Sequence, residues 1–143
     1  LGACLAFGDA ASLFRPGDHG STFGGNPVSC AAAMAVLDTI RDQDLLLNVK
    51  RVGDHWASRF DGIDHPNLAG YRGVGLWRAL ELRGVTAAAV QQAARDEGFL
   101  VNAVAPDAIR LAPPLTLTIA EADEFADALP GILTAAATSG DTP

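Results

Sequence analysis

The sequence contains very little cysteine. Cys4 and Cys30 are the only two in 143 residues, too few for the disulfide framework of a small secreted domain. Both are therefore expected to be small, buried, apolar side chains in a reducing compartment, which predicts a cytoplasmic protein. Lysine is scarcer still: Lys50 is the single one, and its isolation bears on the chemistry considered below.

Positive charge is also in short supply. Ten lysine and arginine residues stand against seventeen aspartate and glutamate residues, a net charge of −7, and no basic cluster is present. This balance excludes nucleic acid as a natural partner, because nucleic acid requires a basic surface. Charges or glycines interrupt every apolar run well short of a membrane-spanning length, so no membrane partner is expected either. The 49% of hydrophobic residues is typical of a globular domain.

Helix-start signals and apolar periodicity predict alternating helices and strands. Asn26 and Pro27 are expected to begin one helix, Thr86 to cap another, and Thr118 with Glu121 to form the capping box of a last one. The expected helices are 27–42, 45–60, 86–98 and one that follows the capping box, preceded by a helical turn at 9–14. The expected strands are 1–7, 71–82, 99–102 and 108–112. This order predicts an α/β fold that becomes α+β, with a small sheet covered by helices.

The segment 19–27 is a glycine-bearing loop that leads into the first long helix. Ser21 and Thr22 supply two hydroxyl groups there, and the two glycines after them allow backbone N–H groups to approach a bound group closely. Hydroxyls, bare amides and a nearby helix N-terminus together are suited to hold a phosphate. The same residues are also explained by an ordinary turn ahead of a capped helix. Their spacing alone does not distinguish a phosphate site from such a turn.

Other polar residues carry no comparable pattern. The three histidines, His19, His55 and His65, have no metal-ligand spacing, so no metal site is proposed. Glu121 and the acidic residues after it lie in the first turn of an expected helix. Carboxylates are favourable there because of the helix dipole, so a solvated face is expected rather than a cation site.

The motifs resemble those of class III pyridoxal-phosphate-dependent aminotransferases. The resemblance rests on His-Gly-Ser-Thr-Phe-Gly-Gly-Asn-Pro-Val-Ser-Cys-Ala-Ala-Ala at 19–33, on Leu-Val-Asn at 100–102, and on Ala-Ile-Arg-Leu-Ala-Pro-Pro-Leu at 108–115. Leu-Gly-Ala-Cys-Leu-Ala at 1–6 is similar to the strand that follows the family's lysine loop. Within the class the pattern is closest to the acetylornithine aminotransferase branch, which serves arginine biosynthesis. Ornithine and 4-aminobutyrate aminotransferases share much of it.

The resemblance implies a fold type I transferase with pyridoxal 5'-phosphate as cofactor and a homodimer as the full-length assembly. Thr22 matches the threonine that reaches across the dimer to the phosphate of the partner subunit's cofactor, and Ser21 lies at the same phosphate. Arg110 is similar to an arginine that contacts a substrate carboxylate, which a planar guanidinium can grip with two hydrogen bonds. The alternative interpretation of Arg110 is a structural ion pair with an acidic residue. Residues 1–44 correspond to the end of the large cofactor-binding domain and 45–143 to the C-terminal small domain.

The sequence departs from the family pattern at the catalytic lysine. The Schiff-base lysine of the family is expected upstream of Leu1, so no catalytic residue is assigned within the chain. Lys50 cannot replace it, because it lies on a polar helix face. The cofactor needs a positioned lysine, so this chain is expected to be a C-terminal fragment that is inactive alone.

Three functions remain open. The first is part of an aminotransferase that transfers the amino group of N-acetylornithine to 2-oxoglutarate, or of an ornithine or 4-aminobutyrate type enzyme. The second is a non-catalytic small-domain module that binds a partner chain. The third is a free-standing phosphate-binding domain, which ranks last because no strand leads directly into the loop and no lysine is near it.

Overall fold

The computed structural model describes residues 1–139, which form two compact units. The first unit is Leu1–Gln43 and the second begins at Asp44.

The first unit consists of a short 3-10 helix, a loop and one long helix. The 3-10 helix η1 is Gly8–Ser12 and the α-helix α1 is Pro27–Asp42. The Asn26 side chain accepts a hydrogen bond from the Ser29 N–H at the start of α1, which confirms the expected cap. No residue among 1–43 is buried.

Two expectations for the first unit are wrong. Residues 1–7 form no strand, because a strand needs a neighbour for its backbone N–H and C=O groups and no pairing partner is present among the described residues. Cys4 is exposed and Cys30 is only half-buried, since this unit contains no core in which to bury a thiol.

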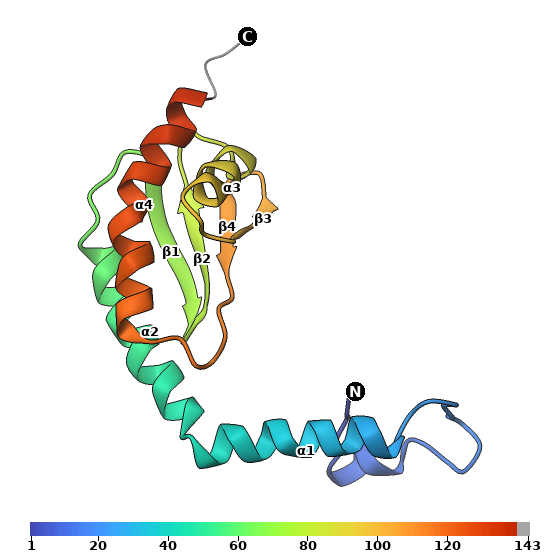
Figure 1. Ribbon diagram of the computed structural model, residues 1–143. Helices are drawn as coiled ribbons and strands as arrows, with labels where there is room; N and C mark the ends of the chain where they lie inside the picture. Colours follow the sequence, from blue (N-terminus) through green and yellow to red (C-terminus); the bar gives the residue numbers. More distant parts are fainter. Residues whose placement is uncertain (140–143) are drawn as a thin grey trace. The chain divides into compact units, whose positions relative to one another are not determined.

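The second unit is an α+β domain with a small sheet covered by helices, as the sequence predicted, and the structure shows that the sheet is antiparallel. Its helices are α2 (Leu45–Asp61), α3 (Ala87–Asp96) and α4 (Ile119–Ser139); its strands are β1 (Leu68–Val74), β2 (Trp77–Leu82), β3 (Asn102–Ala105) and β4 (Ala108–Leu111). The strand order is β1-β2-β4-β3, and every neighbouring pair is antiparallel. In Figure 1, α4 lies between α2 and α3 on the sheet.

The expected strand 71–82 is in fact a hairpin. β1 and β2 pair through Val74 and Trp77, with Gly75 in the left-handed region at a φ of 54°. A left-handed residue suits a tight turn, and glycine adopts it without steric cost. The strand expected at 99–102 begins only at Asn102, because Phe99 packs instead on the core against Phe125.

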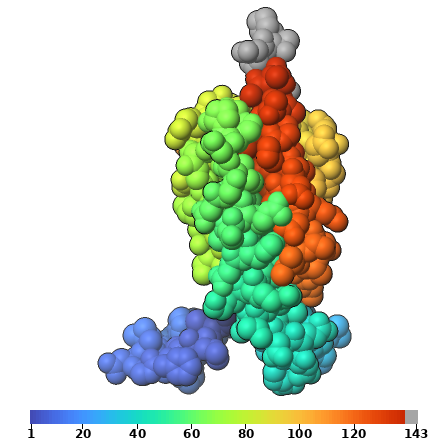
Figure 2. All heavy atoms as spheres, turned by 90° about the vertical axis from the view of Figure 1, so that its left-hand side faces the viewer, coloured from blue at the N-terminus to red at the C-terminus, as the bar shows by residue number. Residues whose placement is uncertain are grey.

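The core lies between the three helices and one face of the sheet. Leu80 of β2 and Ile109 of β4 are fully buried together with Leu129, Ile132 and Leu133 of α4. Along β2 the buried residues alternate with exposed or half-buried ones, as expected for a sheet with helices on one face only. Figure 2 shows α2 and α4 side by side.

Two glycines bring helix α2 against the β1–β2 turn. A Cβ on Gly53 would lie 2.7 Å from the backbone of Gly75, so the two segments meet backbone to backbone. The buried Arg78 side chain stabilises this contact, because it donates hydrogen bonds to the carbonyl oxygens of both Gly75 and Gly53. The arginine therefore has a structural role, with Nε and Nη2 both donating to backbone carbonyls.

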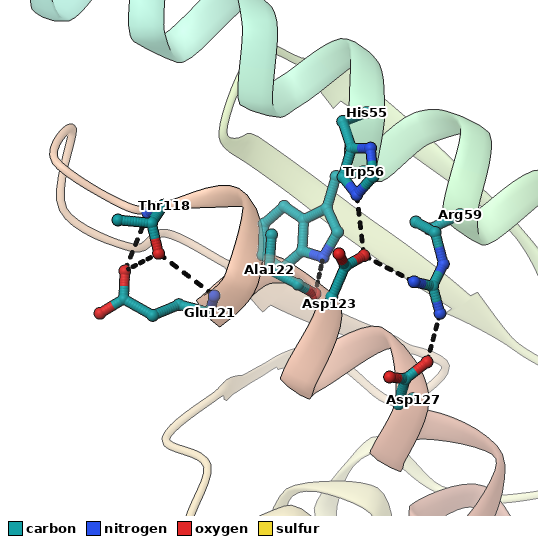
Figure 3. A network of polar contacts seen from close by, with 8 residues as sticks. All are labelled: His55, Trp56, Arg59, Thr118, Glu121, Ala122, Asp123 and Asp127. Atoms are coloured by element: carbon teal, nitrogen blue, oxygen red, sulfur yellow. Dashed lines mark hydrogen bonds and ion pairs between the residues drawn. The ribbon is translucent and has the colours of Figure 1, made fainter.

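A polar network joins α2 to α4 (Figure 3). The Trp56 Nε1–H donates to the Ala122 carbonyl at 3.0 Å, and the Asp123 carboxylate accepts from His55 Nε2 at 2.8 Å and from Arg59 Nη1 at 2.6 Å. Arg59 also pairs with Asp127. Asp123 and Asp127 are thus engaged in helix-to-helix contacts, so the solvated face expected for the acidic residues at this helix start is wrong for Asp123. Glu124 is exposed.

The capping box engages Glu121, another acidic residue at this helix start. The Glu121 carboxylate accepts from both the N–H and the hydroxyl of Thr118, while the Thr118 hydroxyl accepts from the Glu121 N–H (Figure 3). This reciprocal pattern confirms the capping box expected from the sequence. The hydrogen bonds from Thr118 lower the pKa of Glu121.

The substitution Gly53→Ala tests the backbone contact between α2 and the hairpin turn. The added methyl group has no room, so we expect the variant to lose about 1–3 kcal/mol of the free energy of unfolding. Gly131→Ala is the matched control, because it lies in helix α4 with no atom within 4 Å of its added Cβ. There we expect a gain of about 0.5–1 kcal/mol from helix propensity. Equal stabilities of the two variants in urea unfolding would contradict the close approach.

Asp123→Asn tests the network between the helices. The hydrogen bond with His55, assisted by the charge of Arg59, lowers the pKa of Asp123. The folded state therefore favours the carboxylate. Its stabilising contribution is present above the ordinary aspartate pKa, near ~4, and is lost as the pH falls through the folded value.

We expect Asp123→Asn to have a lower unfolding temperature than the unsubstituted chain at pH 7, and the difference to shrink below about pH 4. Asp64→Asn serves as the control, since Asp64 is exposed and has no hydrogen bond or ion pair within residues 1–139. A pH-independent loss in the Asp123 variant would show that packing, not charge, carries the contact.

Candidate functional site

The loop before α1 is held in a turn by its own side chains. The Ser21 Oγ accepts a hydrogen bond from the Gly24 N–H at 2.9 Å, and the Asn26 side-chain amide donates to the Phe23 carbonyl at 2.9 Å. Gly25 has a φ of 71°, in the region that favours glycine. Turn chemistry thus accounts for Ser21, the two glycines and Asn26.

Hydroxyl donors remain available on this turn. The Ser21 hydroxyl acts as an acceptor in the turn and keeps its own proton to donate. The Thr22 hydroxyl makes no hydrogen bond within the part of the chain that the structure describes, and both residues are exposed. Phosphate oxygens are acceptors, so two O–H donors beside a capped helix start fit a phosphate group. The loop lies in the first unit and Arg110 in the second.

The open face of the sheet carries a row of four residues in register. Arg72 pairs with Ala79, Ala79 with Arg110, and Arg110 with Asn102, so the row crosses all four strands. The small Ala79 side chain separates two long arginines. A pocket of ≈ 290 Å³ opens there, and it is lined by Arg72, Gly73, Trp77, Arg78, Ala79, Val104 and Arg110.

The three arginines of this pocket differ in how their charges are compensated. Arg72 pairs with Glu81 at 2.9 Å, and Arg78 donates to two backbone carbonyls. Arg110 has no acidic partner among residues 1–139; its Nη2 donates to the Asn102 amide oxygen at 3.3 Å. The alternative interpretation of Arg110, an ion pair with an acidic residue, is therefore not found in the described part of the structure.

One donor of Arg110 is left without an acceptor. The Nε atom of Arg110 is buried and has no hydrogen-bond partner. Among the described residues, every other buried side-chain nitrogen or oxygen atom has one. The guanidinium carbon of Arg110 also lies 5.3 Å from the centre of the Trp77 ring. A buried donor without a partner is costly, and such groups in native proteins call for an explanation. The chemistry that satisfies a cationic donor best is a carboxylate or phosphate oxygen.

Sequence reasoning found Arg110 but missed its neighbours. Trp77 and Arg72 both fall within the one strand expected at 71–82, and that expectation does not include the hairpin between them. Asn102 ends the Leu-Val-Asn motif at 100–102, and the family resemblance implies no role for it. Period-two alternation places Trp77 and Ala79 on one face. The register that brings Arg72 and Asn102 into the same row depends on pairings between strands far apart in sequence.

The remaining candidates are engaged elsewhere. Lys50 is exposed and pairs with Asp54 at 2.6 Å, and this hydrogen bond raises its pKa, which favours the ammonium form over a nucleophilic amine. Across residues 1–139, no three His, Cys, Asp or Glu side chains gather closely enough to hold a metal ion. None of the helices described has the length and apolar character needed to cross a membrane.

Comparisons with known proteins confirm the family expected from the motifs. Residues 1–133 match the Aminotransferase class-III family. Acetylornithine aminotransferase of Streptomyces coelicolor is 54% identical over 137 residues, which are 96% of this chain and 34% of that protein. The enzyme of the same name from Mycolicibacterium smegmatis is 47% identical over 137 residues, covering 96% of this chain and 35% of that protein.

Solved structures agree with the sequence matches. Acetylornithine aminotransferase from Elizabethkingia anophelis superposes with a TM-score of 0.79 at 30% identity, covering 87% of this chain and 33% of that one. Ornithine δ-aminotransferase of Plasmodium falciparum gives a TM-score of 0.81 at 26% identity, covering 91% and 35%. The chain spans about a third of the length of the curated relatives it matches. It belongs to the class-III aminotransferase family.

Proposed function

We propose that this chain is part of a pyridoxal-phosphate-dependent aminotransferase that transfers the amino group of N-acetylornithine to 2-oxoglutarate, a step of arginine biosynthesis. The observation that carries the proposal is the uncompensated Arg110 guanidinium, with its orphaned Nε, in a pocket on the open sheet face. Relatives named acetylornithine aminotransferase support the choice of amino donor.

In this proposal Arg110 binds the carboxylate of the substrate. Glutamate and 2-oxoglutarate carry a carboxylate next to the reacting carbon, whereas N-acetylornithine carries its carboxylate at the far end of the chain from the amino group that is transferred. Arg110 is therefore assigned to the glutamate and 2-oxoglutarate half of the transfer. Arginine stays protonated and presents a planar set of N–H donors that matches two carboxylate oxygens. Arg72 and Arg78 are less suited, because the charge of Arg72 is paired with Glu81 and the buried Arg78 donates from two of its nitrogens to backbone carbonyls.

The loop of the first unit is proposed to hold the cofactor phosphate through the hydroxyls of Ser21 and Thr22. The free donor capacity of both side chains supports this role. Following the family pattern, Thr22 would serve the phosphate of a partner subunit in a homodimer. Pyridoxal phosphate, when bound, supplies an electron sink that neither arginine nor hydroxyl can provide. No lysine of this chain is assigned a catalytic role, since Lys50 is paired and exposed.

The proposal includes the division of the chain and its place in the cell. Residues 1–44 are assigned to the end of a large cofactor-binding domain and 45–143 to the small domain, which carries the carboxylate pocket. A cytoplasmic location is proposed from the low cysteine content. An ornithine aminotransferase is the second candidate, because the Plasmodium falciparum enzyme of that name superposes as well as the acetylornithine enzyme does.

A chimaera tests the amino donor. This chain would replace the 137 residues that it matches in Streptomyces coelicolor acetylornithine aminotransferase, and the purified protein would be assayed with 2-oxoglutarate and each of three donors. We expect N-acetylornithine to be preferred over ornithine and 4-aminobutyrate. Preference for either of the others would overturn the acetylornithine assignment, and a folded chimaera without activity would favour the non-catalytic module.

Arg110→Ala in that chimaera is expected to raise the KM for 2-oxoglutarate about 10-fold to 100-fold, because hydrogen bonds to a charged group are lost. Cofactor affinity should be unchanged, as measured by the absorbance of bound pyridoxal phosphate. Arg83→Ala is the matched control, an exposed arginine of the same unit that does not line the pocket. An unchanged KM, or lost cofactor, would remove Arg110 from the substrate site.

Thr22→Val in the chimaera is expected to weaken pyridoxal phosphate binding about fivefold to tenfold, the effect of one lost hydrogen bond to an anion. Thr39→Val makes the same change on α1, where the hydroxyl only donates to the Ala35 carbonyl, and should leave cofactor affinity intact. Equal affinities of the two variants would mean that Thr22 makes no phosphate contact.

A further inference from the structure

The Arg110 guanidinium is held by neighbours from two other strands. Asn102 on β3 stands directly opposite Arg110 on β4, and its amide oxygen accepts from Nη2 at 3.3 Å. Trp77 on β2 presents its ring to the guanidinium, with the guanidinium carbon 5.3 Å from the ring centre. Both contacts lie within the second unit, on the open face of the sheet.

Each neighbour orients the cation without cancelling its charge. The Asn102 amide is neutral, so its hydrogen bond directs Nη2 but leaves the positive charge available. The Trp77 ring attracts the cation through its face and uses none of the N–H donors. An acidic residue in either place would instead occupy the guanidinium, as Glu81 does for Arg72.

The contacts also leave donors for a ligand. Nε has no acceptor, and Nη1 makes no hydrogen bond within residues 1–139. A free arginine side chain samples many rotamers, and fixing it before the ligand arrives lowers the entropic cost of binding. Trp77 is 62% exposed, so its indole contributes little to the core. That exposure fits a role in orienting Arg110 better than a role in core packing.

We propose that Trp77 and Asn102 are positioning residues that hold the Arg110 guanidinium ready for a substrate carboxylate. The inference rests on the carboxylate-binding role proposed for Arg110 and extends it to two residues that act through that arginine. It predicts that each substitution weakens carboxylate binding in proportion to the orientation it removes, with the fold unchanged.

The test is a titration of the 143-residue chain with 2-oxoglutarate, followed by NMR of the arginine Nε–H resonances. The Arg110 resonance is identified by its absence in Arg110→Lys. We expect it to move on titration. Trp77→Ala should raise the dissociation constant about 3-fold to 5-fold, the size of an exposed cation–π contact. Trp77→Phe keeps an aromatic ring and should restore most of the affinity.

Asn102 is probed with two variants of opposite character. Asn102→Ala should weaken binding about 2-fold to 3-fold by releasing Nη2. Asn102→Asp should weaken it about fivefold, because the new carboxylate competes for the guanidinium, and added salt should reduce that competition. Leu46→Ala is the control, since Leu46 is 69% exposed on α2 of the same unit and does not line the pocket. Its affinity should match that of the unsubstituted chain.

The outcomes separate this inference from the function on which it rests. If the Arg110 resonance moves and the Trp77 and Asn102 variants bind as tightly as Leu46→Ala, the positioning role is wrong while the role of Arg110 stands. If 2-oxoglutarate leaves the Arg110 resonance unmoved in the unsubstituted chain, both are overturned. The backbone spectrum of each variant shows whether it is folded, and the aromatic rescue at position 77 distinguishes orientation from general damage.

Discussion

Burial of one face of the sheet under the helices is the constraint on which the candidate site depends. Leu80 and Ile109 are fully buried in the same core as Leu129, Ile132 and Leu133 of α4. Side chains alternate along a strand, so fixing Leu80 inward places Ala79 outward, and fixing Ile109 inward places Arg110 outward. A slip of one residue in register would exchange the two faces. The apolar core thereby determines which polar residues meet on the open side.

The polar row on the open face combines side chains that are satisfied locally with one that is not. Its two outer positions are satisfied locally, Arg72 by Glu81 and Asn102 by Arg110. Ala79 provides the space between them, and Arg110 retains an unpartnered donor beside it.

The first unit differs from the second, because none of its 43 residues is buried. A unit without a core gains little from internal packing, in agreement with its proposed assignment to a larger domain.

Local signals in the sequence predicted the helices well and the sheet poorly. Asn26, Thr86 and the pair Thr118 and Glu121 cap the helices as expected, because a cap involves residues within one turn of each other. The hairpin was mistaken for one strand, since Gly75 can mark either a bend or a turn. The strand expected at 1–7 has no partner, and strand formation depends on neighbours that the local sequence does not reveal.

The candidate site was predictable only in part for the same reason. Arg110 stood out through its motif, whereas Trp77, Arg72 and Asn102 join it through the register of β1, β2, β4 and β3. Long-range pairing is a property of the folded chain, so no local pattern reports it. The loop at Ser21 and Thr22 was recognisable because its residues are contiguous, and its turn is built from contacts three residues apart.

A crystal structure of the 143-residue chain with 2-oxoglutarate would test the central claim, that the open sheet face is a carboxylate pocket. The account predicts a carboxylate with its oxygens about 3 Å from the Arg110 guanidinium, lying over Ala79 with Trp77 and Asn102 still in contact with the arginine. A ligand bound away from Arg110, or an Arg110 side chain that pairs with an acidic group of its own chain and closes the pocket, would contradict it.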